Sequence, residues 1–151
     1  MAKVNNVRKV FNFVVEIDGV NQFEFQKVKL PEPEVDATEH GNGNSMVSTP
    51  GLVKWSEGSF TKLKAMPFTD RWAWDWLLSA QNPSTGRGGL AVEYQRTIVV
   101  KEMMPGGAVA INRWLLEEAW CRKVSQGEFD RTSSDNIMQE VTFRVSNVRL
   151  L

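Results

Sequence analysis

The sequence has few of the residues on which catalytic and metal-binding sites depend. It contains one cysteine, Cys121, and one histidine, His40, among 151 residues. A single cysteine excludes an internal disulfide and a cysteine-based zinc cluster. A lone histidine with no cysteine or second histidine nearby gives a metal ion too few ligands. We therefore interpret His40 as a solvated side chain, and we predict that the protein uses no metal and no cofactor.

Surplus charge and long apolar runs are also absent. Lys plus Arg and Asp plus Glu both number 18, so the formal net charge is zero. This balance argues against binding nucleic acid through bulk charge, and it removes the self-repulsion that opposes association of identical chains. No segment approaches the ~18 apolar residues of a membrane span, and the first residues, MAKVNNVRKV, lack the apolar core of a signal peptide. We therefore expect no membrane anchor, and synthesis in a cytosol.

The sequence shows no catalytic constellation. The carboxylates of Glu32, Glu34, Asp36 and Glu39 could serve a small hydrolase in acid–base work, but they lie between prolines in a stretch that is typical of a solvated acidic loop. The glycine-rich segments GNGNS and STGRGG lack the lysine and the strand-to-helix setting of phosphate loops. Cys121 has no histidine nearby in the sequence to act as its base. We therefore predict that the protein is not an enzyme.

Alternating apolar residues, in contrast, recur along most of the chain. Alternation of this kind is typical of half-buried strands. The phase slips between Phe25 and Val28, which indicates a β-bulge. The third strand, LVKW, breaks near Gly58 and resumes as SFTKLK. The other alternating segments are Val7–Asp18, Phe23–Leu30, Leu90–Val100 and Ile137–Val145.

The stretch AINRWLLEEAWCRKV, residues 110–124, fits neither a helix nor a strand well. It is rich in good helix formers, but its large apolar residues point in about four directions on a helix. A strong strand and a Pro-Gly-Gly turn precede it, and this context favours the second strand of a hairpin. Its apolar residues fall on both faces, which suits a strand covered on both sides. We therefore predict a strand, whose second cover could come from another subunit.

Residues 69–81, TDRWAWDWLLSAQ, are predicted to form a helix. Thr69 is a candidate N-cap, and Asn82-Pro83 would end the helix. Its inner face comprises Trp72, Ala73, Trp76, Leu77 and Ala80. Trp74 and Leu78 remain outside this face as a second apolar stripe. We predict that these two side chains contact a neighbouring subunit or a surrounding protein; the alternative is a loop of the same chain.

Residues 31–50, PEPEVDATEHGNGNSMVSTP, show no clear periodicity. Loops of this length tend to be functional or disordered. We predict a long loop that is disordered in the monomer and becomes an ordered assembly arm in a complex. Its candidate assembly residues are Pro31, Glu32, Glu34, Asp36, Glu39, His40, Asn42 and Asn44.

Together these segments predict a mainly β fold. The pattern gives at least six antiparallel strands with one flanking helix at about 69–81 and a long loop at about 31–50, which is typical of a β-sandwich or barrel. The length favours a single domain over residues 1–151. The six tryptophans leave a second interpretation open, a monomeric β-sandwich module that binds a ligand on an aromatic platform.

Several short motifs, taken in order, resemble the tail tube proteins of contractile-tailed phages and related contractile injection systems. These motifs cover nearly the whole chain. They are FNFVVEIDG and QFEFQKV near the start, TPGLVKW after the long loop, FTKLK before the tryptophan helix RWAWDW, then RWLLEEAW and the closing MQEVTFRV.

This resemblance implies a structural role. It implies hexameric rings stacked into a hollow tube, assembled in the host cytoplasm as part of a virion tail inside a contractile sheath. The implied partners are the chain itself and sheath, baseplate and tape-measure proteins. DNA or effectors would pass through the lumen without specific binding, and a lumen wall without surplus basic charge suits this passage because phosphate contacts would retard DNA.

Overall fold

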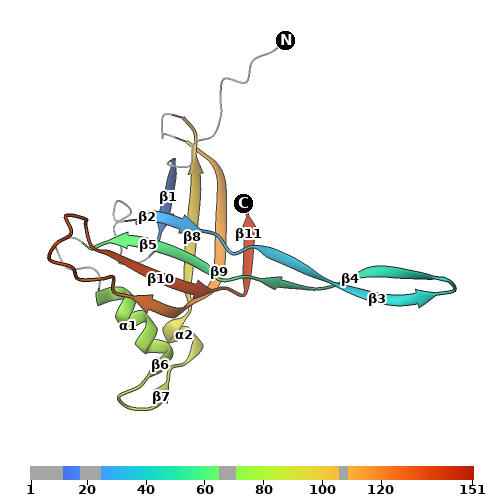
Figure 1. The fold of residues 1–151 in the computed structure, drawn as a ribbon, viewed down its shortest axis with the longest axis horizontal. Coiled ribbons are helices and arrows are strands. Elements are labelled where there is room, and N and C mark those ends of the chain that lie inside the picture. Colours follow the sequence, from blue (N-terminus) through green and yellow to red (C-terminus); the bar gives the residue numbers. More distant parts are fainter. Residues whose placement is uncertain (1–11, 18–24, 65–70, 106–108) are drawn as a thin grey trace, which may run out of the picture.

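The computed structural model describes residues 12–17, 25–64, 71–105 and 109–151, and the described residues form eleven strands and two helices (Figure 1). The elements are β1 (Phe13–Glu16), β2 (Phe25–Lys29), β3 (Pro33–Asn42), β4 (Ser45–Trp55), β5 (Gly58–Leu63), α1 (Arg71–Ala80), β6 (Gln81–Asn82), β7 (Arg87–Gly88), α2 (Ala91–Tyr94), β8 (Arg96–Met103), β9 (Ala110–Ser125), β10 (Met138–Arg144) and β11 (Asn147–Leu150). Neither helix is long and apolar enough to cross a membrane.

Seven strands form one folded antiparallel sheet. Its order is β1-β8-β9-β10-β5-β2, and β11 pairs with β9 outside this path. The first part of β9 pairs with β8 and β11, and its last part pairs with β10. In Figure 1, β8 and β9 run roughly perpendicular to β2 and β5. The two halves of the sheet therefore meet in an orthogonal arrangement, joined by a strand that belongs to both. The predicted mainly β fold with a flanking helix is confirmed.

The structure of β9 explains why the apolar pattern of residues 110–124 fits neither a helix nor a simple strand. Leu116 and Ala119 are both fully buried although they lie three residues apart. Between them, Glu118 adopts a left-handed backbone conformation with φ 54°, which shifts the alternation by one residue. The predicted strand over residues 110–124 is confirmed, and its two apolar faces reflect its passage between the two halves of the sheet.

The core lies between the two halves of the sheet and α1. Trp76 of α1 is completely buried, and its Nε1 donates a hydrogen bond to the Tyr94 carbonyl oxygen at 2.7 Å. The Arg96 guanidinium lies 5.7 Å from the ring centroid of Trp72 and 5.9 Å from that of Trp76. The other fully buried large apolar residues are Val15, Phe60, Ile98, Leu116, Val141 and Phe143.

Two of the predicted strands agree with the structure over their described residues. The strand predicted at residues 7–18 is observed as β1, and residues 7–11 and 18 lie outside the described chain. The predicted bulge is confirmed, because the pairing of β2 with β5 shifts register between Phe25 and Lys27. The helix is confirmed over Arg71–Ala80; Thr69, its predicted N-cap, lies outside the described residues.

The strand predicted from Leu90 is wrong over its first part. Residues 91–94 form the short helix α2, and β8 begins only at Arg96. The Leu90 N–H donates to the Glu93 carboxylate at 3.0 Å, which closes the helical turn. Leu90 is 69% and Val92 is 85% exposed. Their alternation therefore does not reflect a buried strand face.

Candidate assembly surfaces

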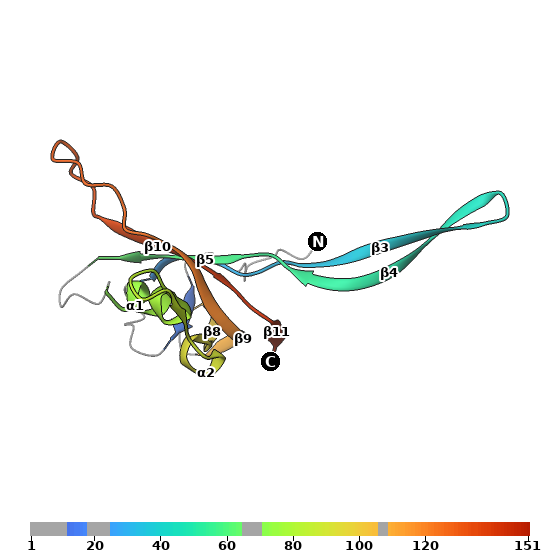
Figure 2. The ribbon, with the colours of Figure 1, turned by 90° about the horizontal axis from the view of Figure 1, so that it is seen from below.

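The acidic segment that the sequence suggested to be a loop is a long β-hairpin, so this prediction is wrong. β3 and β4 pair antiparallel from Pro33↔Trp55 to Asn42↔Ser45, and Gly43 in the turn has φ 62°. The two turn residues are Gly43 and Asn44, and a Gly-Asn pair between two strands is a signal for such a two-residue turn. Figures 1 and 2 show the hairpin extending far beyond the body of the molecule. Both faces of the hairpin lie away from the core, and the apolar alternation of Val35 and Ala37 on β3 ends at Glu39. The segment therefore lacks the sustained apolar alternation of a half-buried strand.

The register of this hairpin separates its side chains onto two faces. Residues directly opposite one another share a face, and so do residues two apart along a strand. One face, here called the apolar arm face, comprises Pro33, Trp55, Val35, Val53, Ala37, Pro50, Glu39, Ser48, Gly41 and Met46. Val35 is 51%, Val53 is 55% and Met46 is 66% exposed. The opposite face is mainly polar and comprises Glu34, Asp36, Thr38, His40, Val47, Thr49 and Lys54. Leu52, at the register shift of β4, is 80% exposed.

The predicted assembly residues of the acidic segment all lie in or next to this hairpin. Pro31 is buried at its base, whereas Glu32 is exposed and its N–H donates to Ser56 Oγ at 2.8 Å. Asp36 pairs with Lys54 at 2.9 Å, and its hydrogen bond and negative charge raise the pKa of Lys54. Among the remaining predicted residues, Glu34, Glu39, His40 and Asn44 are exposed, and Asn42 is the last residue of β3.

Trp74 and Leu78 lie elsewhere, on α1, so the structure does not bring them together with the hairpin. Trp74 is 45% exposed, and Leu78 is half-buried. Leu90, the residue before α2, and Val92 within α2 are also exposed, and α1 packs against α2. Sequence reasoning missed these two residues because it placed them on a strand. It also missed the apolar arm face, for which the Gly43-Asn44 turn was the available signal.

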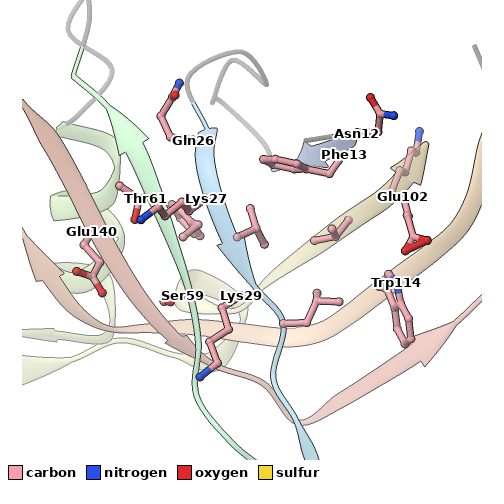
Figure 3. Close-up of a pocket in the computed structure, with 15 residues that line it drawn as sticks. Asn12, Phe13, Gln26, Lys27, Lys29, Ser59, Thr61, Glu102, Trp114 and Glu140 are labelled. Atoms are coloured by element: carbon pink, nitrogen blue, oxygen red, sulfur yellow. The ribbon is translucent and has the colours of Figure 1, made fainter. Parts of the chain in front are cut away.

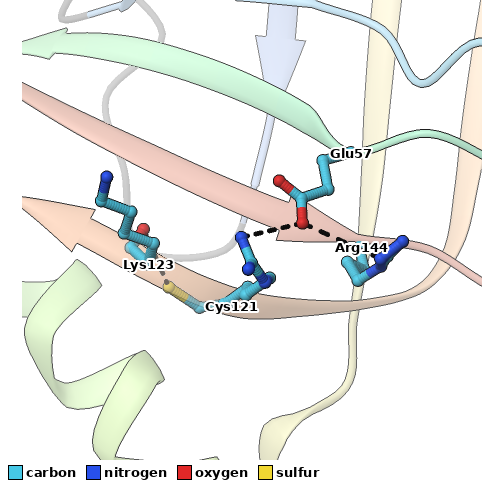
Figure 4. A network of polar contacts seen from close by, with 5 residues as sticks. Glu57, Cys121, Lys123 and Arg144 are labelled. Carbon is cyan, nitrogen blue, oxygen red and sulfur yellow. Dashed lines mark hydrogen bonds and ion pairs between the residues drawn. The ribbon is translucent and has the colours of Figure 1, made fainter.

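The base of the hairpin is tied to the sheet by charged side chains. Glu57 lies in the short link between β4 and β5. Its Oε1 lies 2.8 Å from Arg122 Nη1 of β9 and 3.8 Å from Arg144 Nη1 of β10 (Figure 4). These contacts join the link to two neighbouring strands.

Cys121 lies beside this network but is buried, with 1% exposure. Burial raises the pKa of its thiol from 9.0 to about 12. Because only the thiolate reacts readily with disulfide reagents, we expect no labelling of the folded protein at pH 8 over minutes. Full labelling should follow unfolding in guanidinium, as measured by absorbance with an aromatic disulfide. Rapid labelling of the folded protein would contradict this burial.

A groove of about 910 Å³ opens between β2 and β5 on one side and β1 and β8 on the other (Figure 3). We call it the sheet groove. Half-buried apolar side chains line it, among them Phe13, Val28, Leu30 and Trp114. Its charged lining residues are Lys27, Lys29, Lys101, Glu102 and Glu140. Among the described residues, no group of His, Cys, Asp or Glu side chains is arranged to hold a metal ion.

Comparison with known families identifies the chain. Its residues 9–149 match the family described as T4-like virus tail tube protein gp19. The chain belongs to this family. Its members are structural tube proteins, so the prediction that the protein is not an enzyme is confirmed. None of the curated proteins matches the sequence.

Solved structures of similar shape show how widely this tail tube fold occurs. One chain, in the cap that terminates the tube of the anti-feeding prophage, has a TM-score of 0.80 at 17% identity, with 100% of this chain and 95% of that chain covered. A chain in the PVC sheath/tube terminator of an extracellular contractile injection system has a TM-score of 0.79 at 21% identity, with 99% of both chains covered. Hcp1 from Flavobacterium johnsoniae reaches 0.52 at 11% identity, over 93% of this chain and 94% of that chain. At these identities the likeness concerns the fold.

Proposed function

We propose that this tail tube protein assembles into hexameric rings, and that the rings stack into a hollow tube inside a contractile sheath. The single domain over residues 1–151 would be the repeating unit of a virion tail or a related injection particle. Its partners would be other copies of itself and sheath, baseplate and tape-measure proteins. The lumen would conduct DNA or effectors through the target envelope without binding them specifically.

The projecting hairpin is the observation of this structure that supports the proposal best. None of the buried core residues of the described chain lies in β3 or β4, so the body of the molecule does not need the arm. A two-stranded ribbon by itself is at most marginally stable in water. Contacts with neighbouring subunits would order the arm and cover its apolar face, as an assembly element requires. The zero net charge also permits dense packing of identical chains.

The competing interpretation, a ligand-binding module with an aromatic platform, finds less support. Trp76 is buried, and Trp72 packs against it with ring centroids 5.3 Å apart. Arg96 lies close to both rings. Trp74 is exposed on α1, whereas Trp114 is half-buried in the sheet groove, which Trp74 does not line. The accessible tryptophan rings therefore do not gather into one platform.

Sedimentation velocity of the purified protein tests the proposal. We expect species at sixfold multiples of the 17.1 kDa chain and larger particles as the concentration rises. The binding module would instead sediment as a monomer at every concentration, and that result would contradict the tube function.

A further inference from the structure

We propose that the outer face of β2, β5, β10 and the end of β9 binds an acidic surface of the sheath protein that would surround the tube. This inference rests on the proposed assembly into a sheathed tube, and it names the surface of the chain that meets the sheath and the charge of its partner. We call this surface the basic face.

The strand register places two rows of polar side chains on the basic face. Residues directly opposite one another on neighbouring strands share a face, and so do residues two apart along a strand. One row comprises Lys29, Ser59, Thr142 and Lys123, and the other comprises Lys27, Thr61, Glu140 and Ser125. The row between them comprises Val28, Phe60, Val141 and Val124, which pack in the hydrophobic core. The lysines of the outer rows therefore point away from the core.

Three lysines give this face its charge. Lys27, Lys29 and Lys123 are exposed, and the ion pairs of the described chain involve other side chains. Glu140 lies in the middle of one row and is exposed as well. Because the whole chain has no net charge, this surplus of cations is a local property of the face.

Two arginines extend the face toward the base of the hairpin. Arg144 follows Phe143, whose side chain is buried, so it lies on the outer face of β10. Arg122 is exposed at the register shift of β9. Both arginines lie close to the Glu57 carboxylate (Figure 4). One carboxylate between two guanidinium groups leaves this end of the face cationic.

The described elements leave the basic face uncovered. In Figure 2, α1, α2 and β8 all lie on the same side of β5 and β10, and this is the side of the hydrophobic core. The hydroxyl-bearing residues Ser59, Thr61 and Thr142 are half-buried between the lysines. A flat polar sheet face of this kind is suited to contact with the surface of another protein.

The charge of the face decides between the channel and the outside of the tube. A wall with unpaired lysines would bind phosphates and retard DNA. The outer face of β1, β8, β9 and β11 is different, because its Lys101 is paired with Glu16 at 2.6 Å and its Arg149 is paired with Glu117. Arg113 is a further exposed cation there. We therefore place the basic face on the outside of the tube, where the sheath would lie.

The spacing of the charges favours carboxylates of a protein over the phosphates of a nucleic acid. Neighbouring strands lie about 4.8 Å apart, so Lys29 and Lys123 are separated by about 14 Å. Binding to a phosphate backbone uses several neighbouring cations, and Glu140 would repel it. A protein surface can instead place single carboxylates against the lysines and a hydrogen-bond donor against Glu140.

Neutralisation of two lysines tests the contact. A chain that carries both Lys29→Gln and Lys123→Gln should form tubes as the unmodified chain does, because both side chains are exposed. Its unfolding temperature should stay within about 2 °C of the original. When preformed tubes are mixed with the sheath protein of the same particle, the amount of sheath that sediments with them should fall at least about fivefold, because two ion pairs per subunit are lost.

Two matched variants separate charge from shape. A chain with Lys29→Arg and Lys123→Arg keeps both charges, so sheath retention should stay within about twofold of the original. Glu140→Gln removes the repelling carboxylate, so it should increase retention, by about twofold at low salt. Equal retention by the glutamine and arginine variants would overturn the electrostatic contact.

Binding to simple polyanions tests the class of partner. We expect fluorescence anisotropy to show tighter binding of labelled poly-L-glutamate than of a DNA duplex with the same number of charges, and weaker binding of poly-L-glutamate to the glutamine variant. Tighter binding of the duplex, lost in the same variant, would overturn the assignment of an acidic protein partner.

The outcomes separate this inference from the function on which it rests. Tubes that retain the sheath equally in all variants would overturn the inference and leave the tube function standing. A folded glutamine variant that no longer forms tubes would show that the basic face joins copies of the chain, which also overturns the inference. Failure of the unmodified chain to assemble under any condition would instead overturn the proposed function, and the inference with it.

Discussion

A variant with a shortened hairpin is expected to fold normally and to lose tube assembly. In this variant Asn-Gly replaces residues 35–53, so that the Glu34↔Lys54 pair closes the ribbon. The change removes Val35, Val53 and Met46, which are 51–66% exposed in the isolated chain. Full burial of such a side chain stabilises by about 1.5–3 kcal/mol, and about half of that remains available to an intersubunit contact.

The summed loss is about 2–4 kcal/mol for each subunit contact, which raises the critical concentration for assembly roughly a hundredfold. The free energy of unfolding of the monomer should change little, because no buried core residue of the described chain lies in the removed segment. Thermal unfolding by circular dichroism and tube yield by pelleting measure the two effects. A shortened variant that pellets like the unmodified protein would show that the arm does not take part in assembly.

Two tryptophans on α1 should respond to truncation in opposite ways. Trp76→Ala removes a fully buried ring and leaves the Tyr94 carbonyl oxygen without its hydrogen bond from Nε1. Truncation of a buried tryptophan costs about 3–5 kcal/mol, a large part of the 5–15 kcal/mol that typically stabilises a domain. The unfolding temperature of the monomer should fall by about 6–20 °C.

Trp74→Ala is the matched control, two residues away on the same helix. Its ring is 45% exposed, so the cost to monomer stability should stay below about 1 kcal/mol. We propose that Trp74 and Leu78 contact a neighbouring subunit or the sheath, so this variant should weaken assembly at nearly unchanged monomer stability. A loss of monomer stability similar to that of Trp76→Ala would show that another part of the same chain covers the ring.

The strands with one buried face were the most predictable part of the fold. Val141 and Phe143 alternate with polar residues on β10, and both are buried as expected. β9 was predicted from its position after a strand and a turn, but the φ of 54° at Glu118 could not be read from a Glu-Glu-Ala sequence. The apolar residues of β9 fall on both faces in the sequence because the backbone at Glu118 changes which face is buried.

The candidate assembly surfaces were predictable in part. The location of the arm followed from its unusual composition, but its structure did not, since the hairpin has no face in the core. The sheet groove could not be predicted from the sequence, because its lining residues come from strands as far apart along the chain as β2 and β9. Leu90 and Val92 were misassigned because alternation over a few residues does not distinguish a strand from a short exposed helical turn.

Electron cryomicroscopy of the purified protein at high concentration tests the tube function most directly. The proposed tube function predicts stacked rings of six subunits with a continuous central channel and a hairpin from each subunit in contact with another copy. Particles that remain isolated 17.1 kDa chains at every concentration, without rings or tubes, would contradict it.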